Sequence, residues 1–129
     1  MRAIKFRGKA LHNGVWHYGY LSEISTLPLG EVGEIRSIHE DCVQSTIVKA
    51  ETIGQFTGVT DIYGKEIYEG DILALYFENH CTWKVAVLFE YNGFQVKRKD
   101  GRSTFLGQKP WEIIGNIYDN PELLEKDYK

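Results

Sequence analysis

The feature that most constrains this chain is an alternation of apolar and polar residues, interrupted at intervals by dipeptides that favour tight turns. Within Ala3–Arg7, the side chains of Ile4 and Phe6 fall on one face of an extended strand. Asn13-Gly14 follows, and this dipeptide favours the type I′ turn of a β-hairpin. The alternation resumes over Val15–Tyr20, so this part of the chain predicts a first hairpin.

The rest of the first half is less regular. Residues 22–33 contain Pro28 and two glycines, a composition that predicts a loop. Two short strands are expected after it, around Glu34–His39 and Val43–Val48.

The second half contains a denser series of strand signals. Ile72–Phe77 is a continuous apolar run, as expected of a strand covered on both faces. Asn92-Gly93 and Asp100-Gly101 are turn dipeptides between further strands, and Asn120-Pro121 is suited to begin a short helix. The expected elements are strands at Thr82–Glu90, Phe94–Lys99, Ser103–Leu106 and Ile113–Tyr118, and a helix at Glu122–Lys126.

Length and composition are those of one globular domain, residues 1–129, with a core of its own. Any division into sub-regions 1–54 and 55–129 would fall near Glu51–Gln55, where the pattern changes. No apolar run approaches the roughly 18–20 residues of a membrane helix, and the N-terminus lacks the apolar run of a signal peptide. We therefore expect a soluble protein of the cytoplasm, in which the two cysteines stay reduced.

Three segments resemble one known family. They are Ile4–Arg7 (IKFR), Gln55–Asp71 (QFTGVTDIYGKEIYEGD) and Ile114–Leu124 (IGNIYDNPELL). In order and position they are similar to the motifs of the YopX family of phage and prophage proteins. The resemblance implies a mainly β protein, with an SH3-like barrel in the C-terminal half packed with an N-terminal β-hairpin region, and a short C-terminal helix. It implies no catalytic residue.

An acidic cluster beside two tyrosines lies within the central segment. Carboxylates this close in sequence could form a catalytic pair or a cation site, but turn chemistry explains them more simply. Gly64 suits the tip of a turn, and Asp61 and Asp71 can accept hydrogen bonds from backbone N–H groups. We therefore predict no catalytic residue here. The candidate surface of this motif comprises Tyr63, Lys65, Glu66, Tyr68, Glu69 and Asp71.

The sequence gives little support for a zinc site or for a site that binds a nucleotide cofactor. His39 and Cys42 have the spacing of paired zinc ligands. His80 and Cys81 do not, because neighbours on a strand point to opposite faces. The chain also lacks both a Walker-type phosphate loop and the G-x-G-x-x-G pattern. We predict no metal and no cofactor.

A basic segment near the predicted Asp100-Gly101 turn is the candidate nucleic-acid site. The turn would gather four cations at a hairpin tip, with aromatic residues such as Trp83 and Phe94 on the strands leading to it. Cations beside aromatic rings can bind phosphates and stack bases. Charged hairpin tips are commonly just solvated, however, and the net charge of −3 argues against this function. The four cations are Lys97, Arg98, Lys99 and Arg102.

Three functions are therefore open, in order of preference. The first is a phage or prophage accessory protein that acts as a non-enzymatic protein-interaction module, either by self-association or on a host or phage protein. It follows from the lack of a catalytic set and from an aromatic content of 13%, because exposed aromatic patches commonly mark interfaces. The alternative is a weak nucleic-acid-binding small barrel that uses the basic hairpin tip. The third is an enzyme with an unrecognised acidic pocket.

Overall fold

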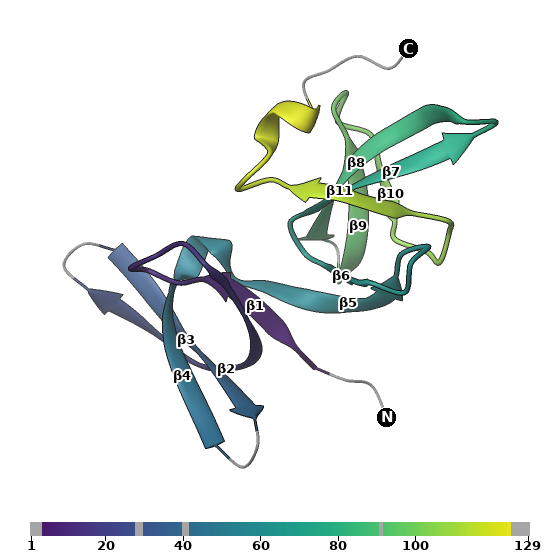
Figure 1. The fold of residues 1–129 in the computed structure, drawn as a ribbon. Helices are drawn as coiled ribbons and strands as arrows, with labels where there is room; N and C mark the ends of the chain where they lie inside the picture. Colours follow the sequence, from purple (N-terminus) through teal and green to yellow (C-terminus); the bar gives the residue numbers. More distant parts are fainter. Residues whose placement is uncertain (1–3, 28–29, 40–41, 91, 125–129) are drawn as a thin grey trace. The chain divides into compact units, whose positions relative to one another are not determined.

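The computed structural model describes residues 4–27, 30–39, 42–90 and 92–124 (Figure 1). Strands dominate, and they form two antiparallel sheets. The chain divides into two compact units, Met1–Phe56 and Thr57–Lys129, and each is described by itself. None of the helical segments in the described part is long and apolar enough to cross a bilayer.

The elements follow one another closely along the chain. Those of the first unit are β1 (Phe6–Lys9), β2 (Trp16–Leu27), β3 (Gly30–His39), β4 (Cys42–Lys49), the 3₁₀ turn η1 (Ala50–Thr52) and the beginning of β5 (Gly54–Thr60). Those of the second unit are the rest of β5, then β6 (Glu66–Tyr68), β7 (Asp71–Phe77), β8 (His80–Glu90), β9 (Gly93–Arg98), β10 (Ser103–Phe105), β11 (Glu112–Asn116) and the 3₁₀ turn η2 (Pro121–Leu124).

The first hairpin is confirmed, although its turn is wider than predicted. β1 pairs with β2 in the register that places Arg7 opposite Tyr18. Of the two turn residues only Gly14 has a positive φ, at 69°, whereas a type I′ turn needs two. The Gly14 N–H instead donates to the Ala10 oxygen at 2.9 Å, which closes a longer loop.

The prediction of a loop over residues 22–33 is wrong. β2 continues to Leu27 and β3 begins at Gly30, and the two pair with one irregularity between Leu21 and Glu23. Glycine usually weakens a strand, but here both glycines lie within β3. Gly33 is in fact buried in the middle of the sheet, where it pairs with Ile24 on one side and Val48 on the other. A residue without a side chain allows the sheet to curl tightly at that point.

The sheet that begins in the first unit curls until β4 approaches the end of β1. Its order is β4-β3-β2-β1-β5-β6, and an isolated bridge joins Ala10, just after β1, to Val48 on β4. The Leu11 N–H also donates to the Ile47 oxygen at 2.9 Å. Ala10, Val48 and Ile35 are almost completely buried inside this curl.

The second unit contains a five-stranded sheet in the order β10-β9-β8-β7-β11. One face of it carries the core, in which buried residues from β6 to β9 pack with Trp111. The described strands form open sheets rather than a closed barrel, so the SH3-like barrel is not confirmed. The fully buried members of this core are Ile67, Leu73, Val85, Val87, Val96 and Trp111.

The last described residues form a 3₁₀ turn, where the sequence predicts a helix. η2 spans Pro121–Leu124, and the Leu123 N–H donates to the Asn120 oxygen at 3.1 Å. The Asn120 side chain accepts from the Asn116 N–H at 3.3 Å, where it braces β11. Lys126 lies outside the described residues.

The close approach of β2 and β3 at Gly19 gives a testable prediction. A Cβ added there would overlap the carbonyl oxygen of Arg36, and backbone cannot move aside cheaply. We expect Gly19→Ala to lower the free energy of unfolding by about 1–3 kcal/mol, the usual cost of overpacking. Urea unfolding followed by circular dichroism measures it. Gly107→Ala, where a Cβ meets nothing within 4 Å, is the matched control, and equal effects of the two would contradict the prediction.

Candidate functional site

The tip of the β9–β10 hairpin is built as its turn residues predict. The Gly101 N–H donates to the Arg98 oxygen at 3.0 Å, and the Arg98 N–H donates to the Arg102 oxygen at 2.8 Å. Gly101 has a φ of 93°, which favours glycine. The Asp100 Oδ1 accepts from the Arg102 N–H at 3.0 Å. This short loop therefore fixes the positions of the two arginines at its ends.

The structure separates the four predicted cations of this hairpin. Arg98 lies opposite Val85 in the register of β8 and β9, on the face that carries the core. Lys97 is its neighbour on β9 and therefore points to the other face, where it is exposed. Lys99 is exposed in the turn. Only Arg98 and Arg102 come together, and both lie near the Asp100 carboxylate, at 3.8 and 3.7 Å respectively.

A tryptophan at this end of the sheet contacts two cations. The Arg98 guanidinium carbon is 5.7 Å from the centre of the Trp83 ring, and the Lys109 Nζ is 5.5 Å from it. Both distances are within the range of cation–π attraction. Lys109 was missed from the sequence because it comes from the loop between β10 and β11. The Trp111 indole N–H shapes that loop by donating to the Gly107 oxygen at 2.9 Å.

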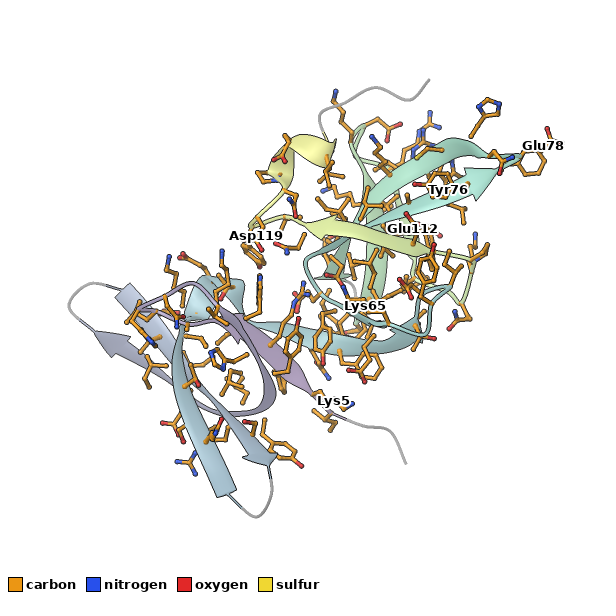
Figure 2. All side chains as sticks on the ribbon, in the orientation of Figure 1. Lys5, Lys65, Tyr76, Glu78, Glu112 and Asp119 are labelled. Atoms are coloured by element: carbon orange, nitrogen blue, oxygen red, sulfur yellow. The ribbon has the colours of Figure 1, made fainter. Side chains whose placement is uncertain are left out.

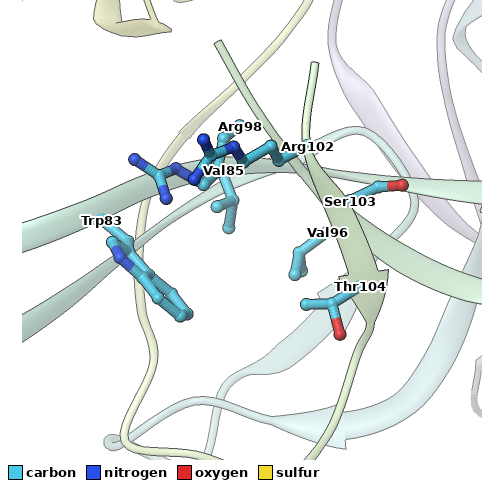
Figure 3. Close-up of a pocket in the computed structure, with 7 residues that line it drawn as sticks. All are labelled: Trp83, Val85, Val96, Arg98, Arg102, Ser103 and Thr104. Carbon is cyan, nitrogen blue, oxygen red and sulfur yellow. The ribbon is translucent and has the colours of Figure 1, made fainter. Parts of the chain in front are cut away.

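Beside Trp83 is a pocket of about 160 Å³ (Figure 3). Its apolar part is formed by Val85 and Val96, which belong to the buried core. Arg98 and Arg102 lie together on one side of it. The pocket thus combines an aromatic ring, an apolar surface and positive charge. Its lining residues are Trp83, Val85, Val96, Arg98, Arg102, Ser103 and Thr104.

Two aspartates of the central segment serve as turn formers. Asp61 is buried, and its Oδ1 accepts from the Tyr63 and Lys65 N–H groups, each at 2.9 Å. Its Oδ2 accepts from the Ile113 N–H at 3.4 Å, which links the turn to β11. Asp71 is also buried, and its Oδ2 accepts from the Tyr68 N–H at 2.8 Å. The prediction that these carboxylates bind backbone N–H groups is confirmed.

The six predicted residues of the motif surface do not form one surface. Tyr68 is 2% exposed and its hydroxyl donates to Glu66 at 3.2 Å, whereas Tyr63 is 76% exposed. Asp71 is buried, Glu69 is half-buried and Lys65 is exposed.

A residue outside that set connects Tyr63 to a second tyrosine. The Tyr63 hydroxyl donates to the Glu112 Oε2 at 3.4 Å. Tyr76, on β7 beside the strand that carries Glu112, lies near the same carboxylate (Figure 2). Loss of hydration raises the pKa of Tyr76 above its ordinary value of 10.0, and the negative charge of Glu112 raises it further. Sequence spacing does not reveal this cluster, because its members come from separate elements.

The zinc hypothesis gains no support from the side chains that can be placed. Among the described residues, no group of three or more His, Cys, Asp or Glu side chains is arranged to hold a metal ion. The Cys81 thiol donates to the Trp83 oxygen at 3.5 Å, and His80 is exposed. The side chains of His39 and Cys42 lie outside the described part.

Comparison with known proteins establishes the family of this chain. Residues 5–125 match the family described as YopX protein. The chain belongs to the YopX family. No curated protein matches it. Two similar solved structures are protein yopX from Bacillus subtilis and protein EF1440 from Enterococcus faecalis.

Both structures share the fold over almost the whole chain. The first is 22% identical with a TM-score of 0.56, and the second is 21% identical with a TM-score of 0.50. Each likeness covers 96% of this chain and 99% of the other. The YopX fold is therefore shared at low identity.

The role of Asp61 in this YopX-family turn can be tested by substitution. We expect Asp61→Ala to lower the free energy of unfolding by about 2 kcal/mol, because the partly buried Tyr63 and Lys65 N–H groups lose a charged acceptor. Asp61→Asn keeps an oxygen for Tyr63 and Lys65 and should cost less. Urea unfolding of both variants checks the order, and a loss as large for Asn as for Ala would contradict it.

The Tyr76 and Glu112 pair gives a prediction in alkaline solution. Because the pKa of Tyr76 is raised in the folded chain, deprotonation costs more there than in the unfolded chain. Stability should therefore fall as the pH rises above the ordinary tyrosine value of about 10. Glu112→Gln should lower the pKa of Tyr76, as measured by NMR titration. Glu78→Gln, which changes a nearby carboxylate not involved in the shift, should leave it in place.

Proposed function

We propose that this chain is a phage or prophage accessory protein that acts in the bacterial cytoplasm as a non-enzymatic protein-interaction module. Membership of the YopX family supports the origin. One structural observation supports the mode of action: β4 is the last strand at one end of its sheet. Ala10 and Leu11 join its outer edge only at Val48 and Ile47, and no described strand pairs with that edge before Ile47. The proposed partner is a second copy of this chain, paired through the same strand.

The backbone of β4 defines which groups lie on that edge. Its residues pair with β3 on one side, from Cys42 to Lys49. The Ile47 oxygen points away from β3, because it accepts from the Leu11 N–H. N–H and C=O directions alternate along an antiparallel strand, so Ser45 and Val43 direct their backbone groups the same way. These groups form a short stretch of open edge.

The side chains of β4 favour pairing at this edge. From Val43 to Val48 the sequence is VQSTIV, with β-branched residues and no charge. Val43 is 63% exposed and Ile47 is 43% exposed. Sheet edges are usually protected by charged residues or proline, and β4 carries neither over this stretch. An uncharged edge can accept another strand by β-augmentation.

A second copy is a natural occupant because antiparallel pairing of β4 with itself is symmetric. With the two-fold axis at Gln44, Val43 of each copy would pair with Ser45 of the other. Each copy would then offer the same groups, and Ile47, whose oxygen already accepts from Leu11, would not be needed. The exposed side chains of Val43 would then lose contact with water, which adds to the backbone hydrogen bonds. A strand from a host or phage protein would use the same edge.

The oligomeric state tests this proposal. Light scattering coupled to size-exclusion chromatography should show a dimer or larger assembly that dissociates on dilution. Val43→Lys combined with Ser45→Pro should give a monomer, because it adds charge and removes an outward N–H. Ile24→Lys, at a 56% exposed position on β2, is the control for added charge in the same unit. A monomeric wild type, or an assembly unaffected by the double substitution, would refute pairing through β4.

A further inference from the structure

We propose that the pocket beside Trp83 binds single-stranded nucleic acid, with one base against the Trp83 ring and neighbouring phosphates on Arg98, Arg102 and Lys109. The site lies wholly in the second unit and uses no residue of β4. It is therefore independent of the pairing proposed above, and each proposal can fail alone.

The combination of groups around Trp83 matches the chemistry of a nucleotide chain. The part of an aromatic ring that is left accessible gives a surface on which any base can stack, and nearby cations bind the phosphates. Trp83 is half-buried, which holds its ring in place while leaving part of it accessible. Arg98 and Lys109 lie 5.7 and 5.5 Å from its centre. Ser103 and Thr104 of β10 also line the pocket.

The size of the pocket decides between a strand and a cofactor. Pockets for drug-sized ligands and cofactors measure about 300–1,000 Å³, whereas this one measures about 160 Å³. A single planar base fits such a volume better than a whole dinucleotide. The rest of the ligand would therefore run over the surface outside, past Arg102, whose side chain is 79% exposed.

Charge at the hairpin tip also favours a phosphate ligand. Arg98 and Arg102 line the pocket, and Lys109 lies over the Trp83 ring beside it. The Asp100 carboxylate is paired with the two arginines. Its contacts at 3.7 and 3.8 Å are long and partly exposed, so they are weak in water. A phosphate can replace this carboxylate as the partner of Arg98 and Arg102, and it offers them more acceptor oxygens.

A single strand fits the site better than a duplex. The bases of a duplex are stacked on one another, so none can lie against Trp83 without being extruded. A strand with unpaired bases reaches the ring at no such cost. A phosphorylated peptide would satisfy the arginines but would bring no base, which distinguishes it experimentally.

The decisive comparison uses two adjacent residues of one strand. Fluorescence anisotropy would follow the binding of fluorescein-labelled oligothymidine at low salt to the wild type, Arg98→Glu and Lys97→Glu. Both variants carry the same change in charge, but only Arg98 lines the pocket. We expect Arg98→Glu to weaken binding about tenfold or more and Lys97→Glu to have a clearly smaller effect. Equal losses would show that net charge alone drives binding and would overturn the proposal.

Two further variants keep the test informative if Arg98→Glu proves unstable. Asp100→Asn keeps the oxygen that accepts from the Arg102 N–H but removes the competing charge, so it should tighten binding several-fold. Trp83→Leu should weaken binding by about fivefold to a hundredfold through lost stacking.

Inorganic polyphosphate should compete poorly with the oligonucleotide. If it competes equally and Trp83→Leu has no effect, the pocket binds phosphate alone. If nothing binds at low salt, there is no such site.

Discussion

The register of β8 between β7 and β9 determines which side chains of the second unit form its core and which line its pocket. Trp83, Val85 and Val87 lie at alternate positions of this strand and so share one face. Val85 and Val87 are buried in the core, while Trp83 lies where that core opens into the pocket. Shifting the pairing by one residue would turn all three to the other side. The core and the pocket are therefore consequences of a single alignment.

Local turn chemistry explains what could be predicted from the sequence. Asn13-Gly14 and Asp100-Gly101 lie between paired strands, as expected. Asn92 also precedes a paired strand, but Gly93 is already the first residue of β9 and pairs with Glu90. A positive φ is a property of one residue, which is why such signals can be recognised without knowing the rest of the chain. The same holds for the Asp61 Oδ1 and the Asp71 Oδ2, which accept from N–H groups only a few residues away.

What the sequence could not predict depends on contacts between distant segments. Residues 22–33 contain breaker residues, but the pairing of β3 with both β2 and β4 outweighs their weak strand preference. Lys109 reaches Trp83 from a separate loop, and no spacing rule links the two. The prediction that four cations gather at the hairpin tip did not take into account that neighbouring residues of a strand point to opposite faces. The pleat of β9 divides this group, because Lys97 and Arg98 are neighbours and must diverge.

The bridge between Ala10 and Val48 has a consequence for how the first unit assembles. It joins residues near the two ends of that unit, which are far apart in the sequence. Closing a loop of this length costs conformational entropy, and such non-local contacts slow folding. During synthesis, β4 is the last of the first four strands to be made. The first unit can therefore reach its curled form only when the chain has been made as far as Val48, and until then the residues around Ala10 stay open to water.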